Sequence, residues 1–292
     1  SKEFANNTNS LINESTNGLK NAENELDERM TPWKQDKTVV TKKMKDKTIT
    51  LNVGDDYEYD CGVEGYTGGW KVLGAENGEL LIMSTVDIGT LQLSGKSGYN
   101  KGVKKLNDMC RPYGTNARSI NVEDINRITG YDPNNTGEGK KYEEGEFNEY
   151  GNKVTYTASG SVATNGQTYT TEISTYEHPD GRKIENNNET SIQVVSTGYN
   201  YFSNTLTRNN TGTTLGIEID SEAYNLLFKK ADNSGNCSYW LASSFIDTRD
   251  RLSNFGVRIV GTDGGIGRFG LYDSTGKVST TSFDVRAVVI LP

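Results

Sequence analysis

The first thirty residues carry apolar side chains at helical spacing. The positions that share this pattern are Phe4, Leu11, Ile12, Ser15, Leu19, Ala22, Leu26 and Met30. Because residues three or four apart lie on the same face of an α-helix, the pattern predicts one amphipathic helix over residues 3–30 with a narrow apolar stripe. Thr31 precedes Pro32, which disfavours helical geometry in the residue before it, so the helix should end there. The helix either packs against its own domain or continues an apolar helix that precedes Ser1.

The rest of the chain alternates short strands with short helices. Strands are predicted at 39–41, 48–53, 70–73, 80–83, 239–243 and 285–290, where β-branched and aromatic residues cluster. Asn77 and Gly78 suit a tight hairpin turn between the strands at 70–73 and 80–83. Helices are predicted at 103–110, 121–128 and 221–231; Ser119 or Asn121 would cap the second, and Asp220 or Ser221 the third. The mixture predicts an α+β fold.

Residues 133–219 differ in composition from their surroundings. They are rich in Asn, Thr, Gly, Tyr and Glu, and they alternate at 154–157 and 168–173. Few apolar residues are present to form a separate core, so we expect an insertion of β-hairpins within the larger domain. The expected organisation is an N-terminal helix over 1–32 and one domain over 33–292 that carries this insertion.

Four blocks near the C-terminus resemble a known family. They are Tyr239-Trp240-Leu241-Ala242-Ser243, Phe255-Gly256-Val257-Arg258, Gly270-Leu271-Tyr272 and Asp284-Val285-Arg286-Ala287-Val288-Val289-Ile290-Leu291. Their order is similar to the C-terminal half of C-type-lectin-fold domains in surface and phage-associated proteins of gut Firmicutes, and in variable proteins of diversity-generating retroelements. Blocks at 69–73, 94–103 and 116–126 agree, so the resemblance spans roughly 47–292. It implies a C-type lectin fold with a β-rich insertion, but it names no ligand.

The resemblance also implies where a ligand would bind. Related domains fill the stretches between the blocks with unrelated residues, and a rigid frame that carries such stretches is typical of a recognition site. The candidate ligand-binding residues are Phe245, Asp247, Thr248, Arg249, Arg251, Arg268, Phe269, Tyr272, Ser279, Thr280, Thr281 and Phe283. Aromatic and arginine side chains dominate binding hot spots. The alternative for Phe245, Phe269 and Phe283 is that they pack into the core.

Composition and charge exclude several classes of function. Hydrophobic residues make up 33% of the chain, which has 32 Gly and 16 Tyr against 8 Phe, as in loop-rich β proteins with tyrosine-decorated surfaces. The net charge of -8 argues against nucleic-acid binding, which depends on clustered Lys and Arg. The only basic run, at 42–47, is interpreted as a solvated strand edge.

No pattern of catalytic or metal-binding residues stands out. The single histidine, His178, lies in the turn sequence His178-Pro179-Asp180-Gly181, and no stretch matches the calcium motifs of sugar-binding lectins. Cys61, Cys110 and Cys237 form no C-x-x-C pair, so zinc is not expected; three buried thiols are favoured over one disulfide. The acidic pairs at 55–56 and 143–144 are interpreted as loop acids. We therefore expect no enzyme, metal or cofactor.

These expectations combine into two hypotheses. The first is a surface-displayed protein of the receptor or adhesin type that binds a protein or glycan through its C-terminal variable face. The second is a structural pilin-like or phage-tail subunit that contacts pilus or tail neighbours through the N-terminal helix, because proteins with this domain often begin with a prepilin-like helix. An enzyme resembling the formylglycine-generating type is the least favoured. Both leading hypotheses place the protein outside the cell, on its surface or on a virion, with membrane anchoring only through a segment before Ser1.

Overall fold

The structure is a computed structural model, and it shows a mixed α+β chain with an N-terminal helix and several sheets. It describes residues 2–130, 217–249, 252–262, 264–273 and 276–292, together with the backbone of short strands at 161–164, 167–170, 176–177 and 183–184. Side chains at 246–254 are outside this description.

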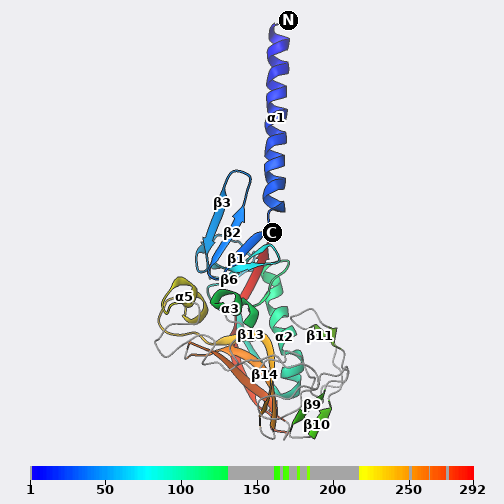
Figure 1. The fold of residues 1–292 in the computed structure, drawn as a ribbon, viewed down its shortest axis with the longest axis vertical. Helices are drawn as coiled ribbons and strands as arrows, with labels where there is room; N and C mark the ends of the chain where they lie inside the picture. The colour runs from blue at the N-terminus through cyan, green and yellow to red at the C-terminus, as the bar shows by residue number, and fades with distance from the viewer. Residues whose placement is uncertain are drawn as a thin grey trace.

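Helix α1 (Lys2–Met30) stands apart from the rest of the molecule. It confirms the predicted helix, and Figure 1 shows it rising from one end of the domain. None of its residues is buried, so the interpretation that it packs against its own domain is wrong. The side chains of its apolar stripe are 56 to 80% exposed: Phe4, Leu11, Ile12, Leu19, Leu26 and Met30. No helix among the described residues has the length and apolar character needed to span a bilayer.

A small antiparallel sheet lies at the base of α1. It consists of β1 (Trp33–Asp36), β2 (Val39–Lys43) and β3 (Thr48–Asn52), which confirms the two strands predicted in this region. The Trp33 backbone N–H donates to Gly78 O at 2.8 Å. The position at which α1 leaves the domain is therefore fixed against the next sheet.

That next sheet has five strands in the order β4-β5-β6-β17-β8. They are β4 (Asp56–Tyr57), β5 (Trp70–Glu76), β6 (Glu79–Ser84), β17 (Ala287–Leu291) and β8 (Arg118–Ser119), and every pairing is antiparallel. Asn77 and Gly78 connect β5 and β6 with φ values of 52° and 84°, the left-handed conformation that the predicted hairpin turn requires. Strand β17 lies between β6 and β8, so residues far apart in the described chain share one sheet.

The second five-stranded sheet carries the C-terminal blocks. Its order is β15-β14-β13-β16-β7. The strands are β7 (Gly89–Ser94), β13 (Tyr239–Arg249), β14 (Leu252–Val260), β15 (Ile266–Asp273) and β16 (Thr280–Val285). In Figure 1, β13 and β14 lie at the end of the domain away from α1. A ligand-binding surface on this sheet would thus face away from the helix.

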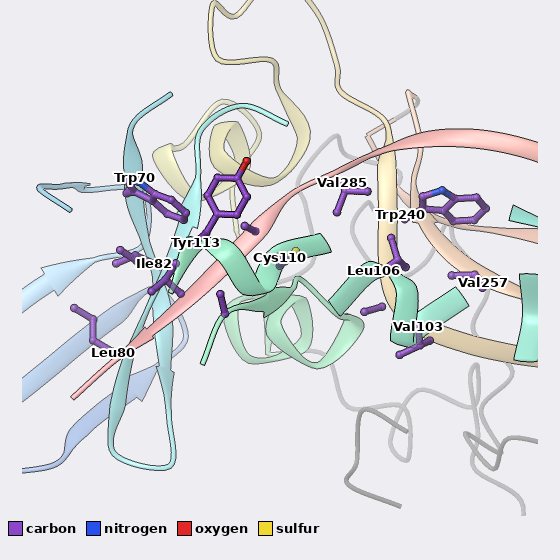
Figure 2. Packing of buried hydrophobic residues seen from close by; sticks show 14 of the residues in the cluster. Trp70, Leu80, Ile82, Val103, Leu106, Cys110, Tyr113, Trp240, Val257 and Val285 are labelled. Atoms are coloured by element: carbon purple, nitrogen blue, oxygen red, sulfur yellow. The ribbon is translucent and has the colours of Figure 1, made fainter. Parts of the chain in front are cut away.

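Helix α2 (Gly95–Cys110) joins the cores of the two sheets. Figure 2 shows Leu106 and Val103 near Trp240 and Val257, while Cys110 and Tyr113 lie toward Trp70 and Ile82; these residues belong to one buried cluster. The helix starts eight residues before its predicted start. Gly98 and Gly102 explain the difference: a Cβ at either would lie 3.0 to 3.2 Å from side chains of β7 or β15. Glycines lower helix propensity, but here they allow close packing of the helix on the strands.

Two further helices cover the other side of the core. Helix α3 (Val122–Thr129) begins with a capping box between Asn121 and Asp124, which confirms one of the two predicted caps. Helix α5 (Glu222–Phe228) is capped by Ser221 and ends three residues earlier than predicted. Their apolar residues form a second buried cluster with residues of β6, β13 and β17.

Most of the predicted insertion at 133–219 lies outside the described residues. Within it, β9 (Ser161–Thr164) pairs antiparallel with β10 (Gln167–Thr170), and β11 (Tyr176–Glu177) pairs with β12 (Lys183–Ile184). The alternating stretch expected at 168–173 overlaps β10. The one predicted at 154–157 is outside the description.

Candidate functional site

The structure contradicts one of the twelve candidate ligand-binding residues. Phe245 is 1% exposed, although it was expected on an open face. It pairs across the strands with Gly256, where an added Cβ would come within 2.5 Å of the Phe245 ring. The guanidinium carbons of Arg258 and Arg268 lie 5.2 and 5.8 Å from the ring centre, within cation–π range. Phe245 is therefore a core residue, because Gly256 leaves room for its ring against the sheet.

Phe269 and Phe283 are half-buried and form an aromatic cluster with Trp240. The ring centres lie 4.9 Å apart for Trp240 and Phe283, 6.4 Å for Trp240 and Phe269, and 6.0 Å for the two phenylalanines. All three pairs have the edge-to-face geometry that aromatic rings prefer. Trp240 Nε1 also donates to Leu91 O at 2.8 Å. The rings of Phe269 and Phe283 therefore pack at the edge of the core, which agrees with the alternative that these residues contribute to the core.

The hairpin between β13 and β14 carries four more candidates. Asp247 and Thr248 pair with Asn254 and Ser253, and Arg249 pairs with Leu252. Their backbone belongs to the sheet, whereas their side chains and all of Arg251 lie outside the described residues. Arg268 is half-buried on β15 beside the Phe245 ring. This part of the expected face stays a prediction.

Three candidates come together near the first turn of α2. Lys96 Nζ lies 4.8 Å from the centre of the Tyr272 ring, and Ser94 Oγ lies 2.6 Å from Thr280 Oγ1. The Gly95 backbone N–H donates to Ser279 O at 3.1 Å, which ties the start of α2 to the residue before β16. Val278, 58% exposed, pairs with Tyr272 in an isolated bridge. We call this group the α2 surface; its members are Ser94, Lys96, Tyr272, Val278, Ser279 and Thr280.

The α2 surface has the chemistry of a binding site. It offers an aromatic ring, an ammonium group, three serine and threonine hydroxyls and an exposed valine within one small area. Thr281 lies next to it, half-buried opposite Leu93. The sequence singled out Tyr272, Ser279 and Thr280 but missed Ser94, Lys96 and Val278. Ser94 and Lys96 lie in the block at 94–103 that had only been used as a mark of the fold.

The cysteine thiols are further reactive groups within the described residues. All three cysteines are free: Cys110 is buried, while Cys61 and Cys237 are half-buried, so the expectation of three buried thiols holds for one of them. Burial raises the pKa of the Cys110 thiol to about 12, which keeps it protonated at neutral pH. No cluster of His, Cys, Asp or Glu suited to a metal occurs among the described residues. His178 lies outside them.

A pair of adjoining cavities, which no sequence pattern had indicated, lies beside Arg286. They have volumes of about 350 and 340 Å³. Both are lined by Thr85, Lys229, Lys230, Ala231 and Arg286. Arg286 is 4% exposed; its Nε donates to Ser84 O at 3.0 Å, Nη1 to Leu226 O at 2.6 Å, and Nη2 also to Ser84 O. An arginine inside the apolar run Val285 to Leu291 was the available signal, but that run was interpreted only as a strand.

Comparisons with known proteins give no independent assignment. No protein-family model, no curated protein and no solved structure matches this chain.

Proposed function

We propose that this chain is a surface-displayed ligand-binding protein of the receptor or adhesin type. Residues 33–292 would form a C-type lectin fold with an insertion, resembling the variable proteins of diversity-generating retroelements. The α2 surface, together with the neighbouring β13–β14 hairpin, would recognise a protein or glycan. The observation that carries the proposal is that Tyr272, Ser279 and Thr280 gather with Lys96 in one partly exposed area.

The position of this surface agrees with display. In Figure 1, α1 leaves the domain at the end where the chain terminates, whereas β13 and β14 lie toward the other end. A helix of 29 residues spans about 43 Å, enough to hold a domain away from its attachment point. The frame beneath the surface is rigid, because the aromatic cluster and α2 pack against the same strands.

Binding to a glycan array and to an array of purified extracellular proteins tests the proposal. If the protein binds a spot on either array, Tyr272→Ala and Thr280→Lys should each abolish that binding. The first substitution deletes the aromatic ring, and the second places a long charged side chain on the surface. Lys105→Gln, on an exposed part of α2 outside this surface, is the control. A ligand whose binding survives both changes is recognised elsewhere, and the α2 surface is then not the site.

Diversification has a separate test at the DNA level. A reverse-transcriptase gene near the coding region, with a near-copy of the codons for residues 239–291, would support it. Variation between strains that is spread evenly over the surface would contradict it, and would favour ordinary divergence of an adhesin.

One observation favours a second candidate, a pilin-like or tail subunit that assembles through α1. The apolar stripe of α1 contacts nothing in the described chain. Isolated helices are marginally stable in water, and most helices owe their stability to packing of an apolar face. A helix of this kind is expected to find partners in an assembly.

Sedimentation velocity separates this candidate from the first. Assembly through α1 should give concentration-dependent oligomers that Leu19→Asp abolishes. Asn13→Asp, an exposed polar position of the same helix, should leave them intact. A monomer at all concentrations, with or without Leu19→Asp, would contradict self-assembly of these residues.

A further inference from the structure

Arg286 carries a buried positive charge whose close neighbours are neutral. Its hydrogen bonds go to the carbonyl oxygens of Ser84 and Leu226. Its guanidinium carbon lies 5.4 Å from the centre of the Tyr239 ring. Burial is the main cause that raises the pKa of the Tyr239 hydroxyl and the Cys237 thiol, so both stay protonated. Within the described part of the chain, no carboxylate oxygen lies within 4 Å of the guanidinium nitrogens of Arg286.

A second arginine of the same domain shows what a compensated charge looks like. Arg118 is held by the carboxylates of Asp124 and Glu76, at 2.7 and 3.2 Å. Buried charges in proteins are usually paired in this manner, because an unpaired ion loses its hydration without replacement. The positive charge of Arg286, in contrast, is compensated among the described residues only by the partial charges of two carbonyl groups and by the face of the Tyr239 ring. The unmatched charge calls for an anion from outside the described chain.

The surroundings of Arg286 leave room for that anion. The residues that line both cavities include three cations, Arg286, Lys229 and Lys230, and no acid. Lys229 Nζ lies 3.8 Å from Asp220, at the limit of an ion pair, and Lys230 has an exposed side chain. The positive charge is therefore concentrated where the two cavities meet.

Four of the five acidic residues that line the cavities are exposed, and the fifth, Asp284, is half-buried. Asp56 and Glu222 are largely exposed and interact with Lys71 at 3.2 and 3.7 Å. Asp284 accepts a hydrogen bond from Thr90 at 3.1 Å, and Asp87 and Asp232 are exposed. The exposed acids make the rim mixed in charge, and Asp284 forms no ion pair with Arg286, which is the buried charge at the junction of the cavities. Such an arrangement favours a small ligand whose negatively charged group reaches Arg286 while its remaining atoms contact the rim.

We infer that the junction of the two cavities binds an oxyanion, the carboxylate or phosphate group of a small ligand, held by Arg286, Lys229 and Lys230. Arginine suits this role because its planar guanidinium matches the paired oxygens of both groups. The two lysines act as further point charges. This site is distinct from the α2 surface, and it does not depend on the proposed recognition function.

Titration with inorganic phosphate and with acetate tests the inference. The full chain is titrated with each anion against sodium chloride at equal ionic strength, and the Arg286 Nε–H signal is followed by ¹H–¹⁵N NMR. Saturable shifts with phosphate, with acetate or with both are expected, and the preferred probe identifies the kind of group that the site takes. Shifts that grow linearly, or that chloride reproduces, would overturn the proposal.

Matched variants locate the binding. Lys230→Gln should weaken the affinity roughly fivefold, the effect of one lost charge contact at a partly open site. Lys105→Gln changes the net charge equally but lies on α2, so it should leave the affinity unchanged. Arg286→Lys keeps the charge and removes the fork, and it should abolish saturable binding if the variant folds. If it does not fold, the comparison of Lys230→Gln with Lys105→Gln decides: equal affinities overturn the proposal.

Discussion

Arg118 and Asp124 form a two-point ion pair in the interior of the domain. Nη1 and Nη2 of the arginine lie 2.7 and 2.8 Å from the two carboxylate oxygens, and the Asp124 side chain is fully buried. Asp124 also accepts the Asn121 backbone N–H at 2.9 Å and contacts Arg127, while Glu76 bridges both arginines. The two carboxylates, Asp124 and Glu76, thus connect strand β8, the start of α3 and the end of β5.

Asp124→Asn should destabilise the domain strongly. The change keeps the shape of the side chain but removes the charge that compensates two arginines, and breaking a buried pair in this way costs about 3 to 5 kcal/mol. Glu76 retains contact with both arginines, so we expect the lower end of that range. Urea unfolding measures it. Asp46→Asn, at an exposed position, should stay within about 0.5 kcal/mol of the unchanged protein, and equal effects of the two substitutions would rule out the structural role of Asp124.

The Arg118–Asp124 ion pair also predicts how the free energy of unfolding changes at low pH. Burial alone would raise the pKa of Asp124, but Arg118, Arg127 and the Asn121 hydrogen bond outweigh it and lower the pKa to about 2. A lowered folded-state pKa means that the contribution is fully present above the unfolded pKa near 3.9 and is lost as pH falls toward 2. The difference in unfolding free energy between the protein and Asp124→Asn should therefore shrink by roughly half between pH 6 and pH 3. A difference that is constant over this interval would show that the carboxylate is not held ionised.

Removal of residues 2–30 should leave the rest of the molecule intact. Since α1 buries none of its side chains, its loss takes away no tertiary packing. The melting temperature of the truncated protein should match that of the longer chain within about 2 °C, and the helical signal in circular dichroism should fall. A much lower melting temperature would mean that α1 folds back onto the domain in solution.

Phe283→Ala should weaken folding more than it weakens any surface contact. The ring packs edge-on against Trp240 at 4.9 Å, and its truncation should cost about 2 kcal/mol, less than for a fully buried phenylalanine. Ser282→Ala changes the exposed neighbour on the same strand and should be nearly neutral. Chemical denaturation of both variants gives the comparison. Unchanged stability of Phe283→Ala, together with loss of ligand binding, would return Phe283 to the binding surface.

The order of residues along the chain was enough to predict the elements that depend on interactions between sequence neighbours. The helix at 3–30, its end at Pro32, the turn at Asn77 and Gly78 and the Asn121 cap all follow from preferences within a few residues. The β-branched blocks likewise predicted where the C-terminal strands lie. The start of α2 was predicted eight residues too late, because glycines have low helix propensity. Their packing against the strands, which allows the helix here, is visible only in the structure.

Burial and spatial neighbourhood were decided only by the tertiary structure. Phe245 and Tyr272 were both aromatic candidates for the ligand-binding face, yet one fills the space above Gly256 and the other lies beside Lys96, which is far away in the sequence. Arg286 became a candidate only when the tertiary structure placed it, between β16 and β17, at two cavities beside Lys229 and Lys230. Hydrophobic periodicity shows which face of a strand points inward, but the partner that covers that face comes from chain segments whose positions the local pattern does not contain.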